Sequence, residues 1–108
     1  MKVFSEALAD LDNAAHVQRI SLFHNDGSAA GVIENKPGSQ GSIRVYYHLY
    51  KKWGRITVEA AHEGQMIYAE HARDAKLNPG KHPNIDRLFD IVANSDVLTV
   101  EVHASTEE

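Results

Sequence analysis

The sequence predicts an α+β domain in which a small antiparallel sheet, made of an N-terminal hairpin and a C-terminal strand, packs against three to four helices. Strand patterns occur in residues 17–34 and 98–102, and the segments between them repeat apolar residues at helical spacing. With 108 residues, of which 43% are hydrophobic and 24% charged, the chain is expected to form one domain over residues 1–108 with a single core.

The first expected elements are a short helix and a hairpin. Apolar residues at positions i, i+4 and i+7, beginning with Phe4, predict a helix over residues 3–13. Residues 17–24 carry apolar side chains on one face of a strand, and the reverse-turn signal Asn25-Asp26-Gly27 follows them. We therefore expect residues 17–24 to pair antiparallel with residues 29–34.

Two longer helices are expected in the middle of the chain. Apolar and aromatic side chains cover a wide arc of residues 43–53, which predicts a central packing helix that ends at Gly54. Thr57 fits the N-cap of a helix over residues 58–76. Small residues dominate the apolar side of this third helix, so a neighbouring element is expected to approach it closely.

A further helix and a strand are expected after residue 80. Pro83 fits the first turn of a fourth helix, because its missing N–H is no loss at that position. Apolar and polar residues alternate over residues 98–103, which predicts a half-buried strand. Residues 105–108 are expected to form a frayed tail.

The composition excludes several classes of function. The chain has no cysteine, which excludes thiol catalysis, cysteine-bound zinc, iron–sulfur clusters and disulfides. A net charge of −4 argues against a nucleic-acid binder and against attachment to an acidic membrane surface. No apolar run approaches the roughly 20 residues that span a bilayer, and the first residues do not resemble a secretory signal, so we expect a cytoplasmic protein.

Two loops that contain glycine and lysine, each followed by a predicted helix, are the best candidates for a binding site. They are residues 34–42 and residues 78–84. A helix N-terminus presents free backbone N–H groups and a lysine adds positive charge, so both loops suit a small anion. The candidate ligand-binding residues are Lys36, Gly38, Ser39, Gly41, Ser42, Lys81 and His82.

The first of these loops has three interpretations. It lacks the residue order of a P-loop, because Lys36 precedes both glycines. The tetrapeptide Gly38-Ser39-Gln40-Gly41 matches the GxxG of RNA-binding KH domains, although a strand and not a helix precedes it. The loop also suits a plain strand-to-helix connection in which glycines supply unusual dihedral angles and serines cap the helix.

The seven histidines form no recognisable metal or catalytic motif. Glu59 and His62 have the Glu-x-x-His spacing of di-iron bundles, but the second such pair that this chemistry needs is missing, so a solvated acidic face is favoured. His71 lies on the apolar side of the third helix, which favours a buried or interface histidine. We predict no catalytic residue, no metal and no cofactor.

Three stretches of the chain together point to a family. They are Ile33-Glu34-Asn35-Lys36-Pro37-Gly38-Ser39, Ala69-Glu70-His71-Ala72 and Asn78-Pro79-Gly80-Lys81-His82-Pro83-Asn84-Ile85-Asp86-Arg87-Leu88. In this combination they resemble a family of small, uncharacterised bacterial proteins that is classed as a domain of unknown function. The resemblance covers most of the chain and implies a bacterial cytosolic setting and a single-domain architecture. It carries over no catalytic residue, ligand or partner.

Two functions therefore compete. The first is a non-enzymatic binding or protein-interaction module, in which the chain forms a homodimer or binds a protein partner through a sheet edge that the short hairpin leaves unpaired. The second is an enzyme or sensor that binds a small anionic ligand at the glycine-rich loop, with help from Lys81, His82 or His71. A cavity that joins the two loops would favour the second function.

Overall fold

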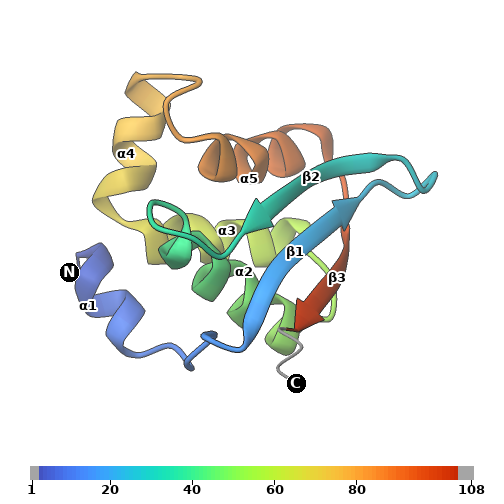
Figure 1. The fold of residues 1–108 in the computed structure, drawn as a ribbon. Helices are drawn as coiled ribbons and strands as arrows, with labels where there is room; N and C mark the ends of the chain where they lie inside the picture. The colour runs from blue at the N-terminus through green and yellow to red at the C-terminus, as the bar shows by residue number, and fades with distance from the viewer. Residues whose placement is uncertain (1–2, 105–108) are drawn as a thin grey trace.

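The structure is a computed structural model that describes residues 3–104, which form a three-stranded antiparallel sheet and five helices (Figure 1). In chain order the elements are α1 (Phe4–Ala9), β1 (Val17–Phe23), β2 (Ala29–Glu34), α2 (Gln40–Trp53), α3 (Val58–Tyr68), α4 (Glu70–Leu77), α5 (Pro83–Asn94) and β3 (Thr99–Ala104). The predicted α+β class is confirmed. The tail predicted at residues 105–108 lies outside the described residues. No helix within residues 3–104 has the length and apolar character that crossing a bilayer requires.

The sheet is centred on β1, because the strand order is β2-β1-β3. Ile20 of β1 pairs antiparallel with Ile33 of β2 on one side and with Val102 of β3 on the other. The predicted hairpin and the C-terminal strand are therefore confirmed. Ile20, Leu22 and Ile33 are buried on the face that the helices cover (Figure 1).

The helical layer is built around α2 and around close contact between α3 and α5. The helix α2 begins three residues earlier than its apolar pattern predicts and ends at Gly54, whose φ of 80° closes the helix in the left-handed region. At Gly64 of α3, a Cβ atom would lie only 2.7 Å from Leu88 Cδ1 of α5. The small residues of α3 thus permit the close approach that the sequence predicts.

The third predicted helix is wrong in one respect, because it is divided in two at Ala69. Thr57 does cap it, since its side-chain oxygen accepts the N–H of Ala60 at 3.1 Å. Ala69, however, has a φ of 53°, a conformation that costs on the order of 1–3 kcal/mol for an L-residue. No glycine or proline marks this break in the sequence. Tertiary contacts accompany it: the Phe4 ring stacks on Tyr68, and Glu70 accepts the Phe4 N–H at 2.8 Å.

The first helix is also shorter than predicted. It ends at Ala9 instead of continuing to residue 13. The reason lies in α2, where Arg44 Nη2 donates to the Leu11 carbonyl at 2.7 Å and Nε donates to the Asp12 carbonyl at 3.4 Å. These carbonyls are bonded to Arg44, so the chain turns toward the sheet after the first two helical turns.

Candidate functional site

The two glycine- and lysine-bearing loops border one cavity, although α2, α3 and α4 separate them in the sequence. The cavity has a volume of about 310 Å³. We call it the loop cavity and define it by its lining residues, which are Phe4, Gly38, Gly41, Ser42, Tyr68, His71, Lys81, His82, Pro83, Asn84 and Ile85. The structure therefore brings the two candidate loops together.

The first loop presents its backbone to the cavity. Gly38 turns the chain with a φ of 96°, and the turn is held by the Ser39 N–H, which donates to the Lys36 carbonyl at 3.0 Å. Within residues 3–104, the N–H groups of Gly41 and Ser42, in the first turn of α2, have no acceptor. Such unpaired N–H groups are expected at a helix N-terminus and give it a partial positive charge.

A glycine at position 41 is needed for the shape of the cavity. A Cβ atom there would lie 3.1 Å from Phe4 Cζ and 3.5 Å from Leu8 Cδ1. The absence of a side chain therefore lets α1 lie against the first turn of α2. It also leaves the backbone of this turn bare toward the cavity.

The second loop contributes side chains instead of backbone groups. Its backbone is already bonded, since the Gly80 N–H donates to Asp86 Oδ2 at 2.9 Å and the Lys81 N–H donates to the Asn78 carbonyl at 3.1 Å. Lys81 and His82 then project from the loop and line the cavity. The cavity thus receives the backbone of one loop and the side chains of the other.

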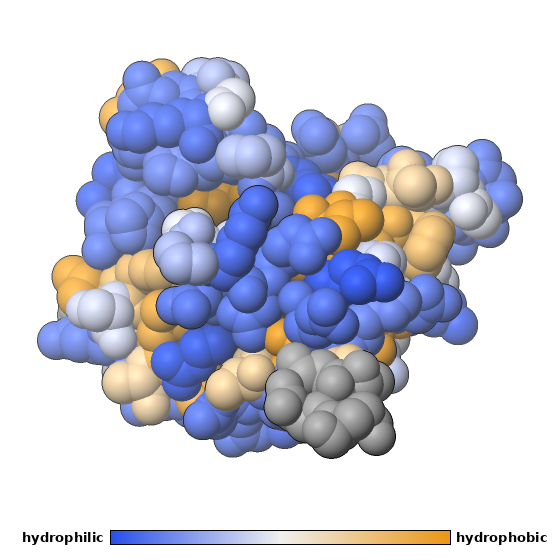
Figure 2. All heavy atoms as spheres, viewed as in Figure 1, coloured by the Kyte–Doolittle hydropathy of each residue, from blue (hydrophilic) through white to orange (hydrophobic). Residues whose placement is uncertain are grey.

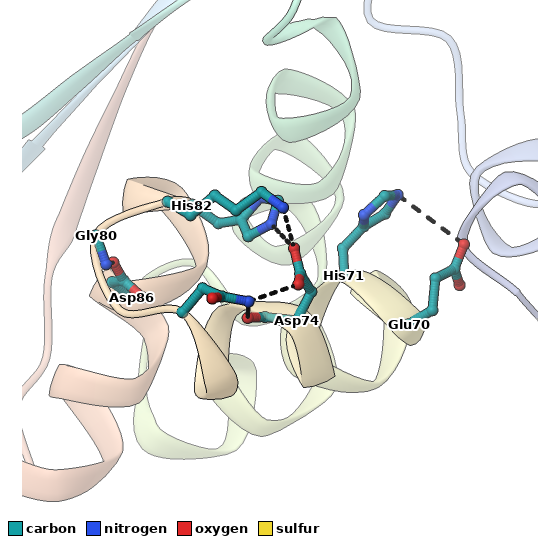
Figure 3. Close-up of polar contacts among 8 residues, drawn as sticks. Glu70, His71, Asp74, Gly80, His82 and Asp86 are labelled. Carbon is teal, nitrogen blue, oxygen red and sulfur yellow. Dashed lines mark hydrogen bonds and ion pairs between the residues drawn. The ribbon is translucent and has the colours of Figure 1, made fainter.

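Asp74 of α4 holds both of these side chains in position (Figure 3). Its Oδ2 lies 2.7 Å from His82 Nε2 and 3.0 Å from Lys81 Nζ, and its Oδ1 accepts from Asn78 Nδ2 at 2.9 Å. The hydrogen bond from His82, followed by that from Lys81, lowers the pKa of Asp74 to about 2. The ionised carboxylate can only accept, so His82 Nε2 carries a hydrogen. Asp74 is not itself among the lining residues.

Four rings in consecutive contact form one wall of the cavity. The Phe4 ring stacks on Tyr68 with a centroid separation of 5.3 Å and meets His71 edge-on at 5.0 Å. His71 in turn lies 5.9 Å from the ring of His82. The polar ends of His71 and His82 and this aromatic surface therefore share a single cavity.

His71 is not a buried histidine in this chain, which corrects one of the two sequence interpretations. Its side chain is 44% exposed, and its Nε2 lies 3.9 Å from Glu70 Oε2 (Figure 3). The break at Ala69 is the physical reason, because it changes the direction of α4 and turns this position away from the core. An interface role for His71 stays a prediction.

Tyr68 connects the aromatic wall to the first turn of α2. Its hydroxyl donates to Ser42 Oγ at 2.7 Å, and burial raises the pKa of Tyr68 well above its ordinary value. The hydroxyl therefore keeps its hydrogen at any physiological pH. Because Ser42 Oγ accepts this bond, its own hydrogen is free to point toward a ligand.

The start of α5 is fixed by a buried network next to the cavity. Tyr46 donates to the Asn84 carbonyl at 2.6 Å, and Arg87 Nη1 donates to Asn84 Oδ1 at 3.0 Å. Burial raises the pKa of Tyr46 to about 12, so it too stays a donor. Gly31 of β2 makes room for the guanidinium of Arg87, since a Cβ there would lie 2.5 Å from Nη2.

Two of the predicted ligand-binding residues do not line the loop cavity. Lys36 is exposed, and the Ser39 hydroxyl is used inside the loop, where it donates to the Glu34 carbonyl at 2.6 Å. The other five, Gly38, Gly41, Ser42, Lys81 and His82, do line it. Sequence reasoning missed the aromatic contribution of Phe4 and Tyr68, because apolar residues at helical spacing usually mark a core.

The acidic helix face shows partners instead of a metal site. Glu63 accepts from Trp53 Nε1 at 3.0 Å and lies 2.6 Å from His48 Nε2 and 2.9 Å from Lys52 Nζ. Its side chain is only 22% exposed, so this residue is not part of a purely solvated face. Glu59 and His62 are exposed, and the described part of the chain contains no group of three potential metal ligands.

Comparison with known proteins gives one match. A family model described as an uncharacterised protein conserved in bacteria, DUF2322, matches residues 4–102. The match spans all eight helices and strands except the last residues of β3. No curated protein and no solved structure matches the chain.

Proposed function

The chain belongs to this bacterial family, and we propose that it binds a small anionic ligand in the loop cavity. One observation carries the proposal: two loops that are distant in the sequence, each with a lysine near a glycine, line the same cavity. We also propose a cytoplasmic location, which the cysteine-free sequence favours.

The polar groups that line the cavity and have no partner within the described residues favour an anion, because they donate hydrogen bonds. The first turn of α2 offers the N–H groups of Gly41 and Ser42 and the free hydrogen of the Ser42 hydroxyl. Lys81 adds a positive charge at the opposite loop. Asp74 is paired with Lys81 and stands outside the lining, so no carboxylate takes part in the wall itself. A ligand rich in acceptor oxygens would satisfy these donors.

Titration calorimetry with phosphate, sulfate, acetate and citrate tests the proposal. We expect saturable binding of at least one anion, and Lys81→Ala should weaken it by about 1–3 kcal/mol, as for other hydrogen bonds to a charged group. Lys76→Ala is the matched control, because Lys76 lies over the Phe89 ring and outside the cavity. The absence of saturable binding, or equal losses in the two variants, would contradict the proposal.

A second candidate is self-association through the sheet, which one observation favours. Among the strands of residues 3–104, β2 has a neighbour on one side only, and its Val32 is 52% exposed. Figure 2 shows apolar surface over the β1–β2 hairpin. A free strand edge can pair with a second copy of the chain. Light scattering across a concentration series would show a dimer that Val32→Lys abolishes, and a concentration-independent monomer would exclude this candidate.

A further inference from the structure

We infer that the ligand of the loop cavity is a phosphate ester that carries a flat aromatic ring, an inference that rests on the anion binding proposed above. A bare anion would use the donors of the cavity but not its aromatic wall. The wall consists of the rings of Tyr68, Phe4, His71 and His82, each in contact with the next.

The size of the cavity exceeds the needs of a bare inorganic anion. Its volume of about 310 Å³ is at the lower end of cavities that hold organic ligands, which start at roughly 300 Å³. Figure 2 shows apolar surface set back in a hollow between the α4 end of the molecule and the loop that precedes α2, with hydrophilic residues around it. A ligand that fills this space has an uncharged organic part as well as a charged group.

The lining contains apolar side chains and hydrogen-bond donors, and a ligand with an aromatic ring and a negative charge would contact both. Phe4, Tyr68, Pro83 and Ile85 provide apolar surface, while Ser42 and Lys81 provide donors. An inorganic ion would leave the apolar surface without a partner, and an uncharged aromatic compound would leave the donors without one. Only a molecule with both parts satisfies the whole cavity.

The aromatic wall also favours a ring over an aliphatic chain. Phe4 and Tyr68 are stacked at an interplanar angle of 19°, whereas Phe4 and His71 are nearly perpendicular at 88°. Tyr68 is buried beneath Phe4, so the accessible part of the wall comes from the partly exposed, nearly perpendicular rings of Phe4 and His71, with which a further flat ring can stack or make edge contacts. The histidine rings are cationic when protonated, and a π-face then adds an attraction of its own.

A phosphate suits the polar end better than a carboxylate does. The available donors are the N–H groups of Gly41 and Ser42, the Ser42 hydroxyl and the Lys81 ammonium. A phosphate monoester presents three strong acceptor oxygens, whereas a carboxylate presents two. Asp74 occupies the single hydrogen of His82 Nε2, which is therefore not counted, but it uses only one of the three hydrogens of Lys81 Nζ.

Calorimetry with inorganic phosphate, methyl phosphate and phenyl phosphate distinguishes the contribution of the ring to the affinity from that of the charge. We expect phenyl phosphate to bind about ten-fold or more tightly than methyl phosphate, which is the contribution of one stacked ring. Phe4→Leu should remove most of this gain and leave methyl phosphate within two-fold of its original affinity. Phe23→Leu is the matched control, because Phe23 lies on β1 outside the cavity.

A second variant is needed because Phe4 also anchors α1, so Phe4→Leu could lower the stability of the fold. His71→Ala removes another ring of the wall from a side chain that is 44% exposed, and it should reduce the phenyl phosphate gain without lowering the melting temperature. Equal affinities for phenyl and methyl phosphate would overturn the inference and leave anion binding intact. Failure of all three phosphates to bind would overturn both. A phenyl gain that neither variant changes would also overturn the inference.

Discussion

The loops at residues 34–42 and 78–84 are similar in composition, yet the first offers its backbone and the second its side chains to the same cavity. In the first, the N–H groups of Gly41 and Ser42 have no acceptor within the described residues. In the second, the Gly80 N–H is bonded to Asp86, an acidic residue in the first turn of α5. The first turn of α2 contains no acidic residue. The carboxylate of Asp86 thus closes a backbone N–H of the second loop internally, whereas the first turn of α2 has no carboxylate and its free N–H groups stay open to a ligand.

The largest expected effect comes from removing the side chain that joins the aromatic wall to the first loop. Tyr68 joins them, because its ring stacks on Phe4 of α1 and its hydroxyl donates to Ser42. Tyr68→Ala should therefore destabilise the protein by about 3–5 kcal/mol, the usual cost of truncating a buried aromatic side chain. Tyr68→Phe keeps the ring and should cost only about 1 kcal/mol. Urea unfolding measures both, and a loss below 1 kcal/mol for Tyr68→Ala would show that the connection is dispensable.

The first turn of α2 can be given the acidic residue that it lacks. Gln40→Glu introduces a carboxylate into the first turn of α2. We expect the helix to gain about 0.3–1 kcal/mol from its dipole, and phosphate affinity should fall several-fold because the added charge competes for the same N–H groups. Asn94→Asp makes the same change of net charge at the far end of α5 and should leave the affinity unchanged. Unaltered phosphate binding in Gln40→Glu would mean that this helix start is not used.

The positions of the two loops could be predicted from the sequence, but the groups that each loop offers to the cavity could not. The turn residues and the helices around Gly38 and Pro83 follow from local chemistry, and both were found close to their predicted places. The shared cavity also depends on the break at Ala69, which no local signal marks because tertiary contacts stabilise it. Asp74 was missed for a related reason: the turn after α4 brings it beside His82, eight residues later.

The second loop should also show a dependence on pH that the first one lacks. Asp74 has a pKa of about 2 in the folded protein, below its ordinary value of 3.8, because His82 and Lys81 bond its ionised form. The stability that this carboxylate contributes is therefore complete above about pH 4 and is lost as the pH falls toward 2. Asp74→Asn should be less stable than the original chain at pH 6, and the difference should vanish between pH 4 and pH 2. Urea midpoints across this range test it, and a difference that persists at pH 2 would contradict the assignment.

The smallest effect is expected at Lys36, and it tests whether position in the cavity matters more than charge. Lys36 and Lys81 both lie near a glycine and near a helix start, but only Lys81 lines the loop cavity. The side chain of Lys36 is exposed and outside the lining of the cavity, so it acts on a bound anion only at a distance, across solvent. At 0.15 M salt such an interaction decays over about 8 Å. Lys36→Ala should therefore keep phosphate affinity within about two-fold at this salt concentration, while Lys81→Ala weakens it by the amount expected for a direct hydrogen bond. Equal losses of phosphate affinity in the two variants would show that anions are attracted by overall charge and that a position in the lining of the cavity gives Lys81 no advantage over Lys36.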